Sequence, residues 1–180
     1  MINILIKIMN LLINDMDEII ENLYLGNLSG ARNIEKLKKQ GIKKVLSLLE
    51  KYFWTVYNES DNIIHKPIII SDFYKENIIK YFGECLNFIK GDDKVLVHCA
   101  AGSSRSATFV IAYIMRNKKM SFKEALEFVK SKRSVISPNP GFKDQLQLFE
   151  KVLIENKYDI DKIKFDEIKL EQKNYNELKI

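Results

Sequence analysis

Residues 94–115 constrain the fold of this chain more than any other stretch. The apolar run 95–97 is typical of a buried parallel strand, and residues 106–115 are apolar nearly all round, as in a buried helix. Between the two lie Cys99, five small residues and Arg105. The loop therefore ends at a helix N-terminus, where amide N–H groups without intrahelical partners and the helix dipole favour an anion.

This loop predicts a phosphate-binding site that carries its own nucleophile. Its small side chains leave the backbone open to an anion, and the planar fork of Arg105 matches two phosphoryl oxygens at once. The residues expected to bind the phosphate are Ala100, Ala101, Gly102, Ser103, Ser104 and Arg105. The helix N-terminus and the neighbouring cation both favour the thiolate form of Cys99, which is the nucleophilic form.

Ser106 follows directly and is expected to donate its hydroxyl to the Cys99 sulfur, which makes the sulfur a better leaving group later in the reaction. The alternative is that Cys99 is a small buried hydrophobe and Arg105 a surface cation. That alternative leaves the order of strand, cysteine, loop, arginine and helix unexplained.

The segment 98–106, His-Cys-Ala-Ala-Gly-Ser-Ser-Arg-Ser, resembles the His-Cys-x-x-Gly-x-x-Arg-Ser/Thr loop of the dual-specificity protein phosphatases, within the cysteine-dependent phosphatase superfamily. Residues 22–26, 41–46 and 136–146 resemble other segments of that family, in the same order. The resemblance covers roughly residues 20–155. It implies hydrolysis of phosphate monoesters through a phosphocysteine intermediate without a metal or other cofactor. Agreeing with this, the sequence has two histidines and no acidic cluster spaced for a divalent ion.

A cysteine mechanism needs a proton donor for the leaving oxygen, and Asp72 is the candidate. It follows the apolar run 67–70, so it sits, like Cys99, at the carboxyl end of a strand, where ligands bind in open α/β sheets. The rivals are Asp61 in a polar loop and Asp92 and Asp93 in a turn at the amino end of the cysteine's strand.

Two further residues are expected to support the loop. The side chain of His98 should point to the opposite face of the strand from Cys99, so we interpret His98 as a loop organiser bonded to backbone rather than as the base. Asn139 braces the loop according to the family resemblance, but an Asn before Pro140 and Gly141 is also an ordinary helix N-cap. Both interpretations stay open.

The pattern along the chain predicts a single-domain α/β fold with a central, mostly parallel twisted sheet flanked by helices. At 180 residues and 46% hydrophobic content the chain is long and apolar enough to bury a core of its own. Beside the strands already named, residues 45–49 are expected to form a core strand. Helices are expected over 28–39, about 73–90, 106–115, from 121 onward, and 141–155.

The predicted organisation has three parts: an N-terminal extension (1–19), the catalytic domain (20–157) and a C-terminal tail (158–180). Residues 1–15 are rich in Ile, Leu and Met but too short and too polar to span a bilayer. We expect an amphipathic helix there that packs on the domain, with membrane-surface docking or self-association as alternatives. The tail carries scattered apolar residues and is expected to dock on the core.

The cysteine usage favours a reducing compartment, the cytoplasm or the nucleus, because the mechanism needs a free thiolate. Cys85 is expected to pack in a helix core; the alternative is a redox partner for Cys99.

The expected substrates are phosphoproteins carrying phosphotyrosine, phosphoserine or phosphothreonine. The loop residues 100–104 are uncharged, which disfavours phosphoinositides. The net charge of +5 is spread along the chain, so no nucleic-acid partner is expected. A phosphatase of RNA 5′-ends or of phosphoinositides and a silent phospho-binding module are the alternatives to a protein phosphatase.

Overall fold

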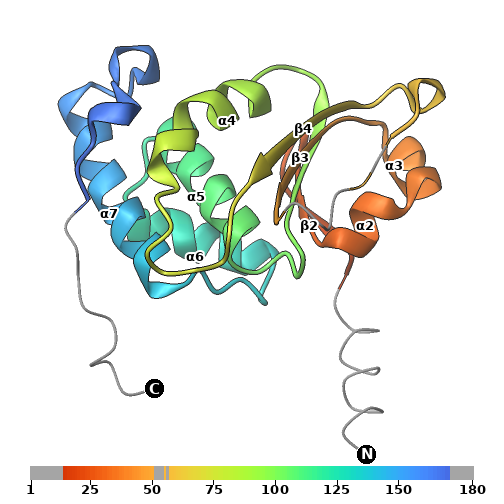
Figure 1. Ribbon diagram of the computed structural model, residues 1–180, viewed down its shortest axis with the longest axis horizontal. Coiled ribbons are helices and arrows are strands. Elements are labelled where there is room, and N and C mark those ends of the chain that lie inside the picture. The colour runs from red at the N-terminus through yellow and green to blue at the C-terminus, as the bar shows by residue number, and fades with distance from the viewer. Residues whose placement is uncertain (1–13, 51–54, 56, 171–180) are drawn as a thin grey trace, which may run out of the picture.

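A computed structural model describes residues 14–50, 55 and 57–170 and contains a five-stranded sheet with helices on both faces (Figure 1). The strands are β1 (Met16–Ile20), β2 (Leu23–Gly26), β3 (Ile42–Leu49), β4 (Ile64–Ile69) and β5 (Lys94–His98). Their order in the sheet is β1-β2-β5-β3-β4, and only β1 runs antiparallel to its neighbour. The predicted α/β class with a mostly parallel sheet is confirmed.

The helices form two layers. On one face lie α2 (Leu28–Arg32) and α3 (Ile34–Gln40), and on the other α4 (Phe82–Ile89), α5 (Arg105–Lys118), α6 (Phe122–Lys132) and α7 (Pro140–Glu155) (Figure 1). Short 3-10 helices are η2 (Glu59–Asp61), η3 (Ile79–Tyr81), η4 (Ile160–Lys162) and η5 (Phe165–Glu167).

Strand β5 is buried from both sides, because each layer of helices covers one face of the sheet. Val95 and Val97 pack in the larger hydrophobic cluster under α4 to α7, whereas Leu96 packs in the smaller cluster under α2 and α3. This double burial explains the continuous apolar run at 95–97. It also holds the end of β5, and the cysteine that follows it, in a fixed position.

The single helix predicted over 28–39 is wrong, because Asn33 divides it into α2 and α3. The backbone of Asn33 leaves the helical region (φ −87°, ψ 84°), and its side chain accepts a hydrogen bond from the Lys36 N–H at 3.0 Å as the N-cap of α3. Gly41 ends α3 as its C-cap.

The helix predicted to begin near 73 begins later, with η3 at Ile79 and α4 at Phe82. The reason is tertiary. The side chain of Gln145 on α7 accepts hydrogen bonds from the N–H groups of Ile78 and Ile79 and donates to the carbonyl of Glu76, which takes these groups away from a helical ladder.

The later helices agree with the sequence. The helix expected from residue 121 onward is α6, and Ser121 and Glu124 form a capping box at its start. The apolar face of α7 is buried; it consists of Phe142, Leu146, Phe149 and Leu153.

The two ends of the chain add to the fold where they are described. Strand β1 takes residues 16–19, which the sequence pattern placed in an N-terminal extension, into the sheet. Of the helix predicted over 1–15, residues 1–13 lie outside the described part, and residues 14 and 15 are not helical. Residues 158–170 pack on the core through a buried Ile160 and through Phe165. The ring centroid of Phe165 lies 6.1 Å from that of Phe149. Within the described ranges no helix has the length and apolar content to cross a membrane.

Candidate active site

The loop 99–104 between β5 and α5 has its carbonyl groups held from outside. The carbonyls of residues 99, 100, 102 and 103 each accept a hydrogen bond. The donors are, in that order, the ring Nδ1 of His98 (3.2 Å), the N–H of Leu28 (3.1 Å), the Nε of Arg133 (3.0 Å) and the N–H of Ser137 (2.9 Å). In a planar trans peptide the N–H points opposite to the carbonyl before it. The amides of residues 100, 101, 103 and 104 therefore face the inside of the loop.

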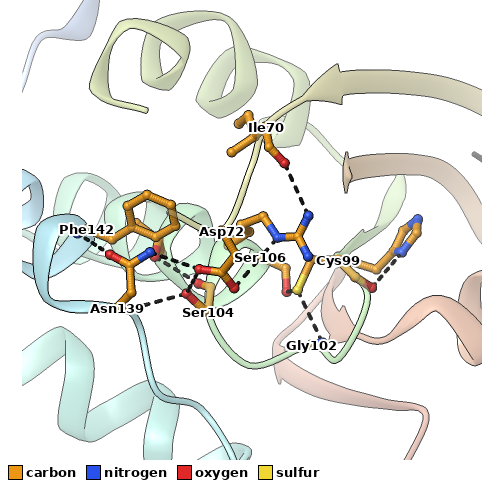
Figure 2. A network of polar contacts seen from close by, with 11 residues as sticks. Ile70, Asp72, Cys99, Gly102, Ser104, Ser106, Asn139 and Phe142 are labelled. Atoms are coloured by element: carbon orange, nitrogen blue, oxygen red, sulfur yellow. Dashed lines mark hydrogen bonds and ion pairs between the residues drawn. The ribbon is translucent and has the colours of Figure 1, made fainter. Parts of the chain in front are cut away.

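The sulfur of Cys99 has two hydrogen-bond donors. It accepts hydrogen bonds from the N–H of Gly102 and from the hydroxyl of Ser106, each at 3.2 Å (Figure 2). The side chain is 1% exposed. Two donors on one sulfur stabilise negative charge there, and the Ser106 contact is the one expected from the sequence.

Glycine is required at position 102. Its backbone has φ +69°, and a Cβ atom there would lie 2.5 Å from the carbonyl oxygen of Gly26 and 2.8 Å from Nη2 of Arg133. At this position the loop is therefore packed closely against the Gly26 carbonyl of β2 and against the side chain of Arg133.

Arg105 begins α5 and reaches across to the segment after β4. Its Nη1 donates to the carbonyl of Ile70 at 3.2 Å, and its Nε lies 3.8 Å from Oδ2 of Asp72. The residue is 8% exposed, so it is not the surface cation of the alternative interpretation.

Asp72 is oriented by two donors on the same oxygen. The hydroxyl of Ser104 and the side-chain N–H of Asn139 donate to its Oδ1 at 2.7 Å and 2.9 Å (Figure 2). The backbone N–H of Asn139 also donates to the Ser104 hydroxyl at 3.2 Å. Neither of these donors contacts Oδ2, which is the oxygen on the side of Arg105.

Both interpretations of Asn139 hold at once. Its Oδ1 accepts from the N–H of Phe142 at 2.9 Å as the N-cap of α7, and its Nδ2 reaches Asp72. The side chain thus joins the start of α7 to Asp72, and the backbone N–H of Asn139 contacts the loop at the Ser104 hydroxyl. The hydroxyl of Ser104, expected near the phosphate, is used to hold Asp72 instead.

The rival acids lie elsewhere. Asp61 forms an ion pair with Lys38 at 2.9 Å, and that pairing lowers the pKa of its carboxyl. Asp92 and Asp93 precede β5 at its amino end, the opposite end from Cys99.

Comparison with known proteins agrees with this geometry. The family model described as "Dual specificity phosphatase, catalytic domain" matches residues 23–152. The chain belongs to the dual specificity phosphatase family. It is therefore a protein phosphatase whose family works through a cysteine-bound phosphoryl group.

Individual relatives show how much of this phosphatase is similar to known proteins. It is 39% identical over 145 residues to "Dual specificity protein phosphatase 1B" of Arabidopsis thaliana, which covers 76% of this chain and 83% of that protein. It is 38% identical over 140 residues to human "Dual specificity protein phosphatase 9", of which it spans about a third (36%). The crystal structure of a human "tyrosine phosphatase-like serine/threonine/tyrosine-interacting protein" superimposes with a TM-score of 0.72 at 38% identity, covering 77% of this chain and 97% of the other.

Three residues that support the site of this phosphatase were missed by sequence reasoning: Ser47, Arg133 and Gln145. Arg133 is 2% exposed; it bonds the Gly102 carbonyl and pairs with Asp17 of β1 at 2.6 Å. Ser47 and Gln145 could have been singled out from the sequence, because each is a polar residue within an otherwise apolar pattern. Arg133 lies among other basic residues after a helix, and nothing in the sequence distinguishes it.

Cys85 lies on α4 and is fully buried, as expected. Burial raises the pKa of its thiol far above the ordinary value, which keeps it protonated and a poor nucleophile. Both cysteines are free thiols, and the redox pairing with Cys99 stays a prediction.

No group of three or more His, Cys, Asp or Glu side chains in the described ranges is arranged to hold a metal ion.

Gly141 fixes the backbone of the acid-bearing segment. A Cβ atom at this position would overlap the carbonyl oxygen of Tyr74, two residues after Asp72. We expect Gly141→Ala to displace that segment and to lower kcat on a phosphothreonine peptide about 10- to 100-fold, because a misplacement of about 1 Å has effects of this size. Gln147→Ala, at an exposed position of the same helix, is the matched control and should retain the wild-type rate. A Gly141→Ala enzyme with unchanged kcat would contradict the expectation.

His98 makes folding sensitive to acid. Burial is the main reason that its pKa falls from 6.5 to about 4. Between these values the unfolded chain binds a proton that the folded chain does not, so stability present at neutral pH is lost as the pH falls. At about pH 4.5 we expect about 2 to 3 kcal/mol less stability from this group than at about pH 7. Denaturant unfolding at both pH values tests this, because His98→Gln should lose that share of the acid dependence.

Proposed function

We propose that Cys99, Asp72 and Arg105 hydrolyse phosphate monoesters on proteins in two steps. The single observation that carries the proposal is the Cys99 sulfur, which is hydrogen-bonded by Gly102 and Ser106 within a loop whose amides face inward. An anionic sulfur and a dianionic phosphate can be stabilised there by the same set of dipoles.

In the first step the Cys99 thiolate attacks phosphorus, and the bond from phosphorus to the substrate oxygen breaks. Asp72 gives its proton to that oxygen as it leaves, because an alkoxide is otherwise a poor leaving group. The two donors on Oδ1 of Asp72 support Oδ2 as the oxygen that carries this proton.

In the second step Asp72, now a carboxylate, takes a proton from water as the water oxygen attacks phosphorus. The phosphorus–sulfur bond breaks, Cys99 leaves as the thiolate, and inorganic phosphate is released. The hydroxyl of Ser106 donates a hydrogen bond to the Cys99 sulfur at 3.2 Å. This bond supports a role for Ser106 in the second step, because it stabilises the negative charge that returns to the sulfur.

Arg105 holds the phosphoryl oxygens in both steps. Its Nε is buried and has no hydrogen-bond acceptor among the described residues, although Nη1 is bonded to Ile70. A buried guanidinium N–H without an acceptor is costly, so a phosphoryl oxygen is a fitting partner for it.

We propose phosphotyrosine, phosphoserine and phosphothreonine proteins as the substrates. The names of the relatives support this class, and Ala100 and Ala101 line an exposed, uncharged stretch of the loop without lysines for additional phosphate groups. We also propose that the protein works in a reducing compartment, the cytoplasm or the nucleus, because the reaction needs Cys99 as a free thiolate.

The test is a substrate panel with purified protein: p-nitrophenyl phosphate, matched phosphothreonine and phosphotyrosine peptides, an RNA 5′-phosphate and a phosphoinositide, each with chelator present. Turnover of both peptides, inhibited by vanadate and unaffected by chelator, is the expected result. Activity confined to RNA or lipid would replace the proposed substrate class. Binding of phosphopeptides without any turnover would identify a phospho-binding module instead.

A further inference from the structure

The sequence contains two histidines. Besides His98, the other one, His65, is also connected to the loop of Cys99. Ser47 Oγ lies 2.8 Å from Nε2 of His65 and 2.6 Å from Nε2 of His98. The Nδ1 of His98 lies 3.2 Å from the carbonyl oxygen of Cys99. The three side chains come from β4, β3 and β5, which are neighbours in the sheet.

The chemistry of the end point sets the direction of this chain of hydrogen bonds. A carbonyl oxygen only accepts, so Nδ1 of His98 carries the hydrogen. A neutral imidazole has one N–H, which makes Nε2 of His98 an acceptor for the Ser47 hydroxyl. Because that hydroxyl has one proton, its oxygen is left to accept from Nε2–H of His65.

Two observations fit this arrangement. Burial lowers the pKa of His98 to about 4, so the ring is neutral at physiological pH. The ring of His65 is oriented by Tyr57, whose ring meets it edge-on with centroids 5.0 Å apart, and the Tyr57 hydroxyl is itself bonded to the carbonyl of Ala31 at 2.8 Å. The half-buried His65 is therefore held in the position from which it donates.

We propose that His65 and Ser47 are positioning residues for the phosphate-binding loop. They fix His98 as its Nδ1–H tautomer, and this tautomer holds the Cys99 carbonyl outward. Because the peptide is planar, the same contact turns the Ala100 N–H toward the bound phosphate. Hydrogen bonds aligned in one direction also polarise one another, so the bond to Cys99 is strengthened by the two before it. The inference rests on the proposed phosphate-binding role of the loop.

The first test reads the tautomers directly. With two histidines, the ¹⁵N spectrum of labelled imidazoles has four ring nitrogens to assign. At neutral pH we expect His98 to carry its hydrogen on Nδ1 and His65 on Nε2. A His98 protonated at Nε2 means that the chain runs in the opposite direction and overturns the proposal, whether or not the protein is an active phosphatase.

The second test measures the affinity for inorganic phosphate by calorimetric titration, which needs no turnover and does not depend on the fraction of active enzyme. His65→Phe and Ser47→Ala should each weaken phosphate binding about fivefold, the loss expected for one hydrogen bond. His65→Gln, whose side-chain Nε2 still donates, should stay within about twofold of wild type, as should the neighbouring control Lys66→Gln.

The outcomes separate this inference from the proposed function. Wild-type protein that does not bind phosphate contradicts the proposed function itself. Normal phosphate affinity in His65→Phe, or equal losses of affinity in His65→Phe and His65→Gln, overturns the positioning role of His65 while the proposed function stands. Should Ser47→Ala or His65→Phe not fold, the tautomers of the wild-type protein decide.

Discussion

Cys99→Ser is expected to lower turnover of every phosphomonoester substrate at least about 1,000-fold, since a serine hydroxyl stays protonated at neutral pH and offers no anionic nucleophile. The loop should keep its shape, because its carbonyls are held by Leu28, Arg133 and Ser137 rather than by the sulfur. The variant should therefore still bind inorganic phosphate while failing to turn substrate over.

The control is Cys85→Ala, which removes the other thiol and should retain activity. Acid quenching of the wild-type enzyme during turnover, followed by mass spectrometry, should find one phosphoryl group on the peptide that contains Cys99. A Cys99→Ser protein with substantial activity, or phosphate trapped on any other residue, would falsify the mechanism.

Asp72→Asn is expected to lower kcat on a phosphothreonine peptide about 100- to 10,000-fold, the usual contribution of a general acid. The amide oxygen of asparagine can still accept from Ser104 and Asn139, so the position of the side chain is kept and only the proton is lost. The loss should be much smaller on an aryl phosphate with a strongly acidic leaving group, because such an oxygen departs without protonation.

Asp61→Asn is a matched control, because it makes the same chemical change at a rival carboxylate that pairs with Lys38. It should leave both rates at the wild-type level. Equal losses on the two substrates in Asp72→Asn would show that this residue shapes the site instead of donating the proton.

Much of the site could be predicted from local sequence. The strand, the small-residue loop and the helix around Cys99 are adjacent in the chain, and their pattern agrees with the observed elements. Asp72 was predicted at the same edge of the sheet as Cys99, because both residues follow strands and the carboxyl ends of parallel strands meet at one edge. The start of the helix after Asp72 was not predicted correctly. The side chain of Gln145, which is 66 to 69 residues away in sequence, forms hydrogen bonds with backbone groups of 76–79.

From the sequence alone we could predict the small-residue loop with its cysteine and arginine, and the α/β class, because these depend on neighbouring residues and on hydrophobic periodicity. Only the tertiary structure decided how the loop is held: by Arg133, by Ser47 through His98, and by Asn139 through Asp72. These contacts join residues that are distant in sequence. The groups that the side chains bond are backbone carbonyls, a hydroxyl and a carboxylate, and many other side chains could have bonded the same groups. A residue type alone does not specify such a pairing; the packing of α7, α6 and the sheet around the loop does.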